Sequence, residues 1–222
     1  FLGLGLASIP VFVYVVWLLP GATARVLVFL ISKVFYRVRV RGSENLPDEG
    51  GVLLVANHVS FVDGVALLLD LPREPRIIAR SDPSHGRLYR RLAIDLGTIF
   101  IEPGKRSLVR SLDVASESLN RGEVVCVFPE GKISKTGEVE EFRRGFLRIL
   151  KDNSSPTVPI FLRGLWGSIF SWEGGSVLWK WPQKIPFPVE ILIGPPVDEP
   201  VDPEKARRAV IALEPNDKEV SR

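Results

Sequence analysis

Short apolar runs alternate with amphipathic segments along most of this chain. From residue 36 onward, runs of strand length that are rich in β-branched residues and bounded by Gly, Pro or Asn occupy 36–42, 51–56, 75–80, 97–102, 123–128, 157–162 and 189–194. Between them, apolar residues recur at helical spacing over 60–70, 84–95, 105–120, 141–152 and 203–214. This alternation predicts an α/β fold with a mixed, largely buried β-sheet flanked by helices.

The N-terminal 35 residues follow a different pattern. Residues 1–24 contain no charged side chain, a second apolar stretch follows Arg25, and a basic cluster comes next: Lys33, Arg37, Arg39 and Arg41. A helix over 1–24 would reach roughly 36 Å, enough to cross the hydrocarbon core of a bilayer, but Pro10 and Pro20 argue against one straight span. The pattern predicts a membrane-associated helical hairpin over 1–35, with the cations at the headgroups. A signal peptide and a buried core helix are the alternatives.

These boundaries divide the chain into the segment 1–35, a folded domain over 36–214 and a solvated tail over 215–222. The net charge of +3 suits an anionic membrane surface as well as nucleic acid, although the short basic runs YRRL and FRRGF are weak support for nucleic-acid binding. Cys126 is the single cysteine, which excludes an internal disulfide, and it lies in an apolar run that predicts a buried thiol. With two histidines and no H-x-x-x-H or C-x-x-C spacing, no metal site is predicted.

Polar residues interrupt the apolar pattern at the stretch NHVSFVD, residues 57–63. Asn57 and His58 come at the carboxyl end of a predicted strand, where open α/β sheets place their ligand sites. A neutral imidazole can accept the proton of an attacking hydroxyl while a carboxylate, here Asp63, holds its other N–H. Four intervening residues at a turn-to-helix junction allow Asp63 to fold back beneath the ring. Ser60 and Asp63 also form an S-x-x-D capping pattern, which is a structural alternative for these two residues.

A second polar stretch, VFPEGKISKTGEVEEFRRGF over 127–146, follows another predicted strand. Pro129 and Gly131 predict a tight turn, and Gly131 would let a substrate approach the backbone closely. Glu130 is a candidate to bind the hydroxyls or headgroup of a substrate, and three cations are candidates for a phosphate: Lys132, Arg143 and Arg144. A loop with a solvated, charged helix face is the alternative.

A third strand end, in GTIFIEPGKRS over 97–107, is followed by Pro-Gly and two cations. Lys105 and Arg106 open the predicted helix, and amides and cations at a helix N-terminus suit a phosphate. A fourth segment, TVPIFLRG over 157–164, reads as an apolar strand.

Taken in order, these four segments resemble the motifs of the glycerophospholipid acyltransferases, the lysophosphatidic-acid-acyltransferase-like (PlsC-like) enzymes. NHVSFVD is similar to their His-x-x-x-x-Asp block, GTIFIEPGKRS to the second block, VFPEGKISKTG to the Phe-Pro-Glu-Gly block and TVPIFLRG to the fourth. The resemblance covers roughly residues 36–200. It implies transfer of an acyl group from acyl-CoA or an acyl carrier protein to a lysophospholipid hydroxyl at a membrane, without a covalent acyl-enzyme, a metal or another cofactor.

The same resemblance implies roles for individual residues. His58 would be the general base and Asp63 its orienter, Glu130 and Gly131 would bind the acceptor glycerol, and Lys105 or Arg106 its phosphate. Many lysophosphatidate enzymes have an Arg where this chain has Pro103. In this respect the chain is similar to bacterial lysophosphatidylethanolamine acyltransferases that are fused to an acyl-carrier-protein synthetase or a lysolipid transporter. The missing initiator Met suits a domain cut from such a fusion, and the location implied is the cytoplasmic face of the bacterial inner membrane.

Two other functions fit the same residues. One is a non-catalytic lipid-binding or membrane-tethering module of the same fold. The other is a lipid hydrolase that uses His58 and Asp63 to activate water. Ser60 as a nucleophile is a weaker hypothesis, because no G-x-S-x-G elbow surrounds it.

Overall fold

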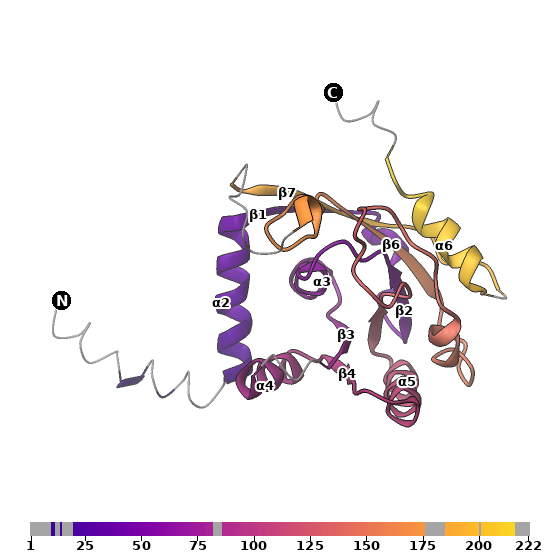
Figure 1. Ribbon diagram of the computed structural model, residues 1–222. Coiled ribbons are helices and arrows are strands. Elements are labelled where there is room, and N and C mark those ends of the chain that lie inside the picture. Colours follow the sequence, from indigo (N-terminus) through magenta and orange to yellow (C-terminus); the bar gives the residue numbers. More distant parts are fainter. Residues whose placement is uncertain are drawn as a thin grey trace.

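A mixed seven-stranded sheet forms the centre of the molecule (Figure 1). The computed structural model describes residues 10, 11, 14, 20–81, 86–175, 185–199 and 201–215. Along the sheet the strands follow the order β1-β7-β6-β2-β5-β3-β4. Neighbouring strands are parallel except β6 and β7, which are antiparallel. Their bounds are β1 (Tyr36–Arg41), β2 (Val52–Ala56), β3 (Pro75–Arg80), β4 (Ile99–Ile101), β5 (Val124–Val127), β6 (Thr157–Arg163) and β7 (Phe187–Ile193).

Helices cover both faces of this sheet. Figure 1 shows α2 and α3 on one side and α5 and α6 on the other. The α-helices are α2 (Pro20–Phe35), α3 (Asp63–Asp70), α4 (Arg87–Asp95), α5 (Lys105–Asn120) and α6 (Pro203–Ile211). Three short 3-10 helices complete the described elements: η1 (Ser43–Asn45), η2 (Arg144–Arg148) and η3 (Glu173–Gly175).

Strand β2 is the centre of the hydrophobic core, with every residue fully buried. Because side chains of a strand alternate between its two faces, Leu53 and Val55 pack with Leu112 of α5 and Val210 of α6 in one cluster. Val52, Leu54 and Ala56 pack in the opposite cluster, which includes Leu67 of α3. Burial on both faces is what a near-continuous apolar run predicts. Because β2 is the fourth of the seven strands in the sheet, its carboxyl end and the polar residues that follow it lie in the middle of the sheet edge.

Two predicted helices differ from the observed ones. The segment predicted as helical from residue 60 becomes helical only at Asp63, because the amide of Ser60 is bonded to the Asp63 carboxylate rather than placed within a helix. The predicted helix over 141–152 is wrong: this segment contains the 3-10 helix η2 followed by turns. Two of its buried side chains, Phe146 and Ile149, are three residues apart, and the amide of Ile149 donates to the carbonyl of Phe146 (2.9 Å) as a 3-10 turn requires.

Part of the N-terminal prediction lies outside the described residues. Helix α2 ends at Phe35, and β1 begins at the next residue; most of residues 1–19, which belong to the predicted hairpin over 1–35, are not described. Among the residues that the structure describes, no helix combines the length and the apolar character needed to cross a bilayer. Residues 176–184 and the tail from 216 onward are also outside the described part of the chain.

Candidate active site

The turn that follows β2 brings His58 and Asp63 together. Nδ1 of His58 lies 2.8 Å from Oδ2 of Asp63, as the spacing in the sequence predicts. The same oxygen accepts hydrogen bonds from the backbone amides of Val59 (2.7 Å) and Ser60 (2.9 Å). The Asp63 side chain is fully buried, whereas that of His58 is 20% exposed. The carboxylate is therefore fixed from three directions, and the imidazole reaches the surface.

The surroundings of Asp63 determine the state of the imidazole. Burial raises the pKa of Asp63, and the hydrogen bonds from His58 and from the two amides oppose this rise. A carboxylate that accepts a hydrogen bond from Nδ1 of His58 favours the imidazole tautomer in which Nδ1 carries the proton. Nε2 is then the basic nitrogen that can accept a proton from a substrate.

Phe128 fixes the plane of the histidine ring. Its ring stacks on that of His58 with centroids 4.2 Å apart and an interplanar angle of 18°. Phe128 directly follows β5, the parallel neighbour of β2. The sequence assigned no role to this residue, because an aromatic side chain at the end of an apolar strand is typical of a core position.

Glu130 joins the turn after β5 to the turn after β2. Its side chain is 1% exposed, and Oε1 accepts a hydrogen bond from the backbone N–H of His58 (2.9 Å). Oε2 is buried and has no hydrogen-bond partner. Burial raises the pKa of Glu130 to about 7, against the lowering effect of the His58 amide. One carboxylate oxygen therefore supports the backbone of His58, and the other is enclosed by the protein.

Because Gly131 has no side chain, the side chain of Arg143 can pack closely against the Pro-Glu-Gly turn. Gly131 has a φ of 69°, and a Cβ atom on it would lie 3.3 Å from Nε of Arg143. The amide of Arg143 donates to the carbonyl of Pro129 (3.0 Å), which holds the two segments together. The close approach predicted at Gly131 is therefore made by a side chain of this chain.

A polar cavity of about 660 Å³ opens beside this turn. It brings together Glu130, Lys132, Arg143 and Arg144, four of the candidates from the sequence. Lys132 forms an ion pair with Glu140 across it (2.5 Å). The residues that line it are Glu130, Lys132, Glu140, Glu141, Phe142, Arg143, Arg144, Asp202, Pro203 and Glu204.

Lys105 and Arg106 do not line this polar cavity. Both are exposed at the first two positions of α5, directly after β4. Strand β4 is the edge strand, and β5 and β3 lie between it and β2. The structure therefore does not bring these two cations together with the other phosphate candidates.

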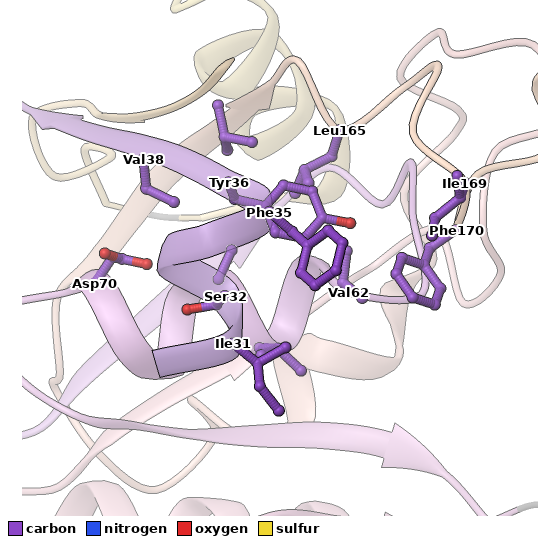
Figure 2. A pocket seen from close by; sticks show the side chains of 13 residues that line it. Ile31, Ser32, Phe35, Tyr36, Val38, Val62, Asp70, Leu165, Ile169 and Phe170 are labelled. Atoms are coloured by element: carbon purple, nitrogen blue, oxygen red, sulfur yellow. The ribbon is translucent and has the colours of Figure 1, made fainter. Parts of the chain in front are cut away.

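An apolar cavity of about 250 Å³ is lined by residues of α2, α3 and β1, together with residues of the loop after β6 and one residue of β7 (Figure 2). Val62, the residue before Asp63, belongs to its wall. So does Tyr36, whose pKa is raised to about 12 by burial, although a hydrogen bond with Ser168 lowers it. The lining residues are Ile31, Ser32, Phe35, Tyr36, Val38, Val62, Val65, Ala66, Asp70, Leu165, Ile169, Phe170 and Val189. The sequence did not predict this cavity, because four separate segments form it.

The side chains of Asn57 and Ser60 form hydrogen bonds with backbone groups of other segments. The Asn57 side chain donates to the carbonyl of Leu162 (3.1 Å) and accepts from its amide (2.7 Å), which extends the β2–β6 pairing by one residue. The Ser60 hydroxyl donates to the carbonyl of Phe170 (3.2 Å). Ser60 thus joins the turn after β2 to the loop after β6.

Comparisons with known proteins identify the family of this chain. Residues 37–163 match the family model described as Acyltransferase. The chain belongs to the acyltransferase family. Within this family it is 30% identical over 132 residues to 1-acyl-sn-glycerol-3-phosphate acyltransferase LPAT1, chloroplastic, of Arabidopsis thaliana, covering 59% of this chain and 37% of that protein. It is 27% identical over 152 residues to a probable enzyme of the same name from Mycoplasma pneumoniae, covering 64% of this chain and 56% of that protein.

A solved structure of the family has the same fold. The crystal structure of the 1-acyl-sn-glycerophosphate (LPA) acyltransferase PlsC from Thermotoga maritima superposes with a TM-score of 0.64 at 27% identity, covering 87% of this chain and 77% of that one. The first relatives are longer proteins, and the matched region spans between about a third and just over half of their length. The family assignment and the mixed α/β architecture predicted from the sequence are confirmed.

Proposed function

We propose that this acyltransferase moves a fatty acyl group from an acyl thioester to the free glycerol hydroxyl of a lysophospholipid. The observation that carries the proposal is the contact between His58 and the fully buried Asp63 at the carboxyl end of the central strand. Nε2 of His58 takes the proton of the acceptor hydroxyl, and the hydroxyl oxygen attacks the thioester carbonyl. The C–S bond then breaks, and the departing thiolate takes the proton from the imidazolium. Asp63 stabilises that imidazolium and is not itself acylated.

The apolar cavity is the proposed site of the transferred acyl chain. Val62, the residue before Asp63 in the chain, belongs to its wall, which places part of the cavity close in sequence to the catalytic pair. Its lining is almost entirely aliphatic and aromatic, which suits an alkyl chain. The thiol carrier, an acyl carrier protein or CoA, would then remain on the exposed side of His58.

The polar cavity is the proposed site of the acceptor headgroup. Arg143 and Arg144 would bind its phosphate, and Glu130 would accept a hydrogen bond from a glycerol hydroxyl or an ammonium group. The carboxylates in the lining are Glu130, Glu140, Glu141, Asp202 and Glu204, against the cations Lys132, Arg143 and Arg144. A bare phosphomonoester would be repelled by this excess of carboxylates, whereas a phosphoethanolamine headgroup carries both charges. The lining therefore supports lysophosphatidylethanolamine as the acceptor, although the relatives are named for 1-acyl-sn-glycerol-3-phosphate.

A membrane location for the enzyme is supported by the surface of α2. Val26, Leu30 and Val34 are each more than half exposed, and their four-residue spacing puts them on one face of the helix. Lys33 is exposed on α2, and Arg37, Arg39 and Arg41 alternate outward on β1. An apolar face bordered by cations suits the cytoplasmic surface of an anionic membrane such as the bacterial inner membrane. A fused or associated acyl-carrier-protein synthetase or lysolipid transporter is part of this proposal.

The test crosses acceptors with donors. Lysophosphatidylethanolamine and lysophosphatidate are each offered with acyl-CoA and with acyl-carrier protein, and products are measured by mass spectrometry. We expect a diacyl product with lysophosphatidylethanolamine preferred. Preference for lysophosphatidate would refute the headgroup assignment alone. Free fatty acid without any acceptor product would indicate the hydrolase, and no product from folded protein would indicate the binding module.

A further inference from the structure

Six exposed cations gather around the carboxyl end of the edge strand β4. Helix α4 leads into β4 and α5 leaves it, and Figure 1 shows the two helices on either side of β3 and β4. Because β3, β4 and β5 run parallel, both connecting helices begin at the carboxyl edge of the sheet. The cations of these helices, which we call the β4 basic surface, are Arg87, Arg90, Arg91, Lys105, Arg106 and Arg110.

Charges of opposite sign are separated along both helices. In α4 the three arginines precede Asp95, and in α5 all three cations precede Asp113 and Glu117. Neither helix has an acidic residue in its first turn, where the macrodipole favours anions and disfavours cations. The stability of the helices therefore does not explain why the cations lie at the end nearest the carboxyl edge of the sheet.

Most of the β4 basic surface is not neutralised by the protein itself. Arg90 forms an ion pair with Glu102 (2.5 Å), and the other five cations form none with the residues that the structure describes. Exposed apolar side chains accompany the cations on both helices: Ile94, Leu108 and Val109 are each between 38% and 52% exposed. A surface that combines arginines without ion pairs and exposed aliphatic side chains suits a protein partner of opposite charge.

The β4 basic surface lies within reach of the proposed base along one edge of the sheet. His58 follows β2, and β5 and β3 lie between β2 and β4. Three strand spacings amount to about 14 Å. A phosphopantetheine arm has roughly thirteen bonds from phosphorus to sulfur and extends about 15 Å, at about 3.5 Å for every three bonds. A thioester on such an arm can therefore reach His58 from a carrier that is held at β4.

We propose that the β4 basic surface docks an acidic carrier protein that presents the acyl donor on a phosphopantetheine arm. This inference rests on the proposed function and names the source of its donor. Carboxylates of the carrier contact the cations of α4 and α5, and the arm extends along the sheet edge to His58. Attraction between the opposite charges orients the carrier before the thioester enters the site.

A carrier protein fits this surface better than two other anionic partners. Helices α4 and α5, each about 10 Å wide, flank β4 on two sides, so the single nucleotide of CoA is too small to contact both. A membrane is proposed to lie against the exposed face of α2, and α5 is on the other side of the sheet from α2. A partner that approaches from outside the membrane can contact both helices.

A comparison of two donors tests the proposal. Initial rates with acyl carrier protein and with CoA, both carrying the same acyl chain, are measured for wild type, Arg91→Glu, Arg110→Glu and the double variant. The matched control is Lys151→Glu, which reverses an exposed cation shortly before β6, at the amino edge of the sheet. Because the rate with acyl-CoA is measured on the same preparation, it reports how much of each variant is folded.

We expect the double variant to lose at least about tenfold in kcat/KM with the acyl carrier protein, since steering by opposite charge raises association rates roughly ten- to a thousandfold. Each single variant should lose less, and kcat/KM with acyl-CoA should stay close to wild type in all of them. Lys151→Glu should match wild type with both donors. Raising NaCl from about 50 to about 300 mM should slow the wild-type reaction with the carrier and affect the double variant less.

Each contrary result has a separate meaning. An unchanged rate of the double variant with the carrier, while wild type uses both donors, would overturn this inference and leave the proposed function standing. Equal losses with both donors, or use of acyl-CoA alone by the wild type, would also overturn it. Weaker flotation of the double variant with phosphatidylglycerol vesicles, in place of a carrier effect, would assign the surface to the membrane. A wild type that forms no product from any donor would overturn the proposed function, and the inference would fail with it.

Discussion

The backbone N–H of His58 donates to Oε1 of Glu130 at 2.9 Å, so the turns after β2 and β5 support each other. The ring of His58 is held separately, by Asp63 at Nδ1 and by Phe128 on its face. The carbonyl of His58 also accepts from the amide of Ser134 (2.7 Å). The proposed base is thus positioned through its backbone by the same segment that lines the polar cavity. A change at Glu130 can therefore affect both the base and the headgroup.

Glu130 should make the stability of the fold depend on pH. Its pKa is raised from 4.5 to about 7, so the folded protein holds this proton more tightly than the unfolded chain. The contribution is fully present below pH 4.5 and is lost as the pH rises through 7. Glu130→Gln keeps an accepting oxygen for His58 but does not titrate. We take the difference in free energy of unfolding, Gln variant minus wild type. This difference should rise by on the order of 3 kcal/mol between pH 4.5 and pH values above 7, because only the wild type loses the contribution. Urea unfolding at pH 5 and pH 8 measures it, and a difference independent of pH would refute the burial of an ionising Glu130.

Gly131 should affect acceptor binding more than turnover. An alanine there must adopt a positive φ, which costs roughly 1–2 kcal/mol, and its Cβ would press on Nε of Arg143. We expect Gly131→Ala to raise the KM for the lysolipid about tenfold, with a smaller change in kcat, because Arg143 is displaced from the phosphate. Gly145 is the matched control, since a Cβ on it would meet open space. Equal kinetics in the two variants would argue against a role of Arg143 in headgroup binding.

Asn57 should matter for stability. Asn57→Ala leaves both the N–H and the C=O of Leu162 without their side-chain partner in a buried place. Each unsatisfied group costs about 1–3 kcal/mol, so we expect a loss of at least about 2 kcal/mol by chemical denaturation. Asn45→Ala, which removes one partly buried bond to the carbonyl of Ile193, serves as the comparison and should cost less. Similar losses would mean that Asn57 does not hold β6 to β2.

The exposed face of α2 should bind vesicles. Burying one Leu or Val side chain is worth about 1.5–3 kcal/mol, so Leu30→Glu and Val34→Glu should each weaken binding to vesicles that contain anionic phosphatidylglycerol by about tenfold or more. Val109→Glu changes a residue of α5 with 40% exposure on the opposite side of the sheet and should bind like wild type. Flotation assays measure this. Unchanged binding of the α2 variants would exclude this face as the membrane contact.

Local contacts of the site could be predicted from the sequence, and contacts between distant segments could not. The His58–Asp63 contact spans five residues and depends only on a turn entering a helix. The contact between His58 and Glu130 requires β2 and β5 to be neighbours, and strand order is not encoded in the apolar pattern of either strand. Lys105 was assigned to the phosphate because it opens a helix after a strand and because the family resemblance implies that role. The sheet order instead places it at β4, beyond β5 and β3.

The helix predicted wrongly over 141–152 and the apolar cavity that was not predicted both depend on information that the spacing of apolar residues does not carry. Buried residues at i and i+3 fit both an α-helix and a 3-10 helix, so Phe146 and Ile149 did not distinguish them. The apolar cavity depends on how α2 lies against α3, which is fixed by contacts such as the ion pair of Lys33 with Asp70 across the two helices. Such long-range pairs have no signature in the local sequence.

The most direct test of the account is the turnover of His58→Ala, measured with the preferred donor and acceptor. Loss of the general base should lower kcat by about two to four orders of magnitude, while the urea midpoint stays close to that of wild type. Asp63→Asn should lose a comparable amount. The double variant should be no slower than His58→Ala, because the two residues act as a unit. Near-normal turnover of folded His58→Ala would contradict the central claim that this imidazole activates the acceptor hydroxyl.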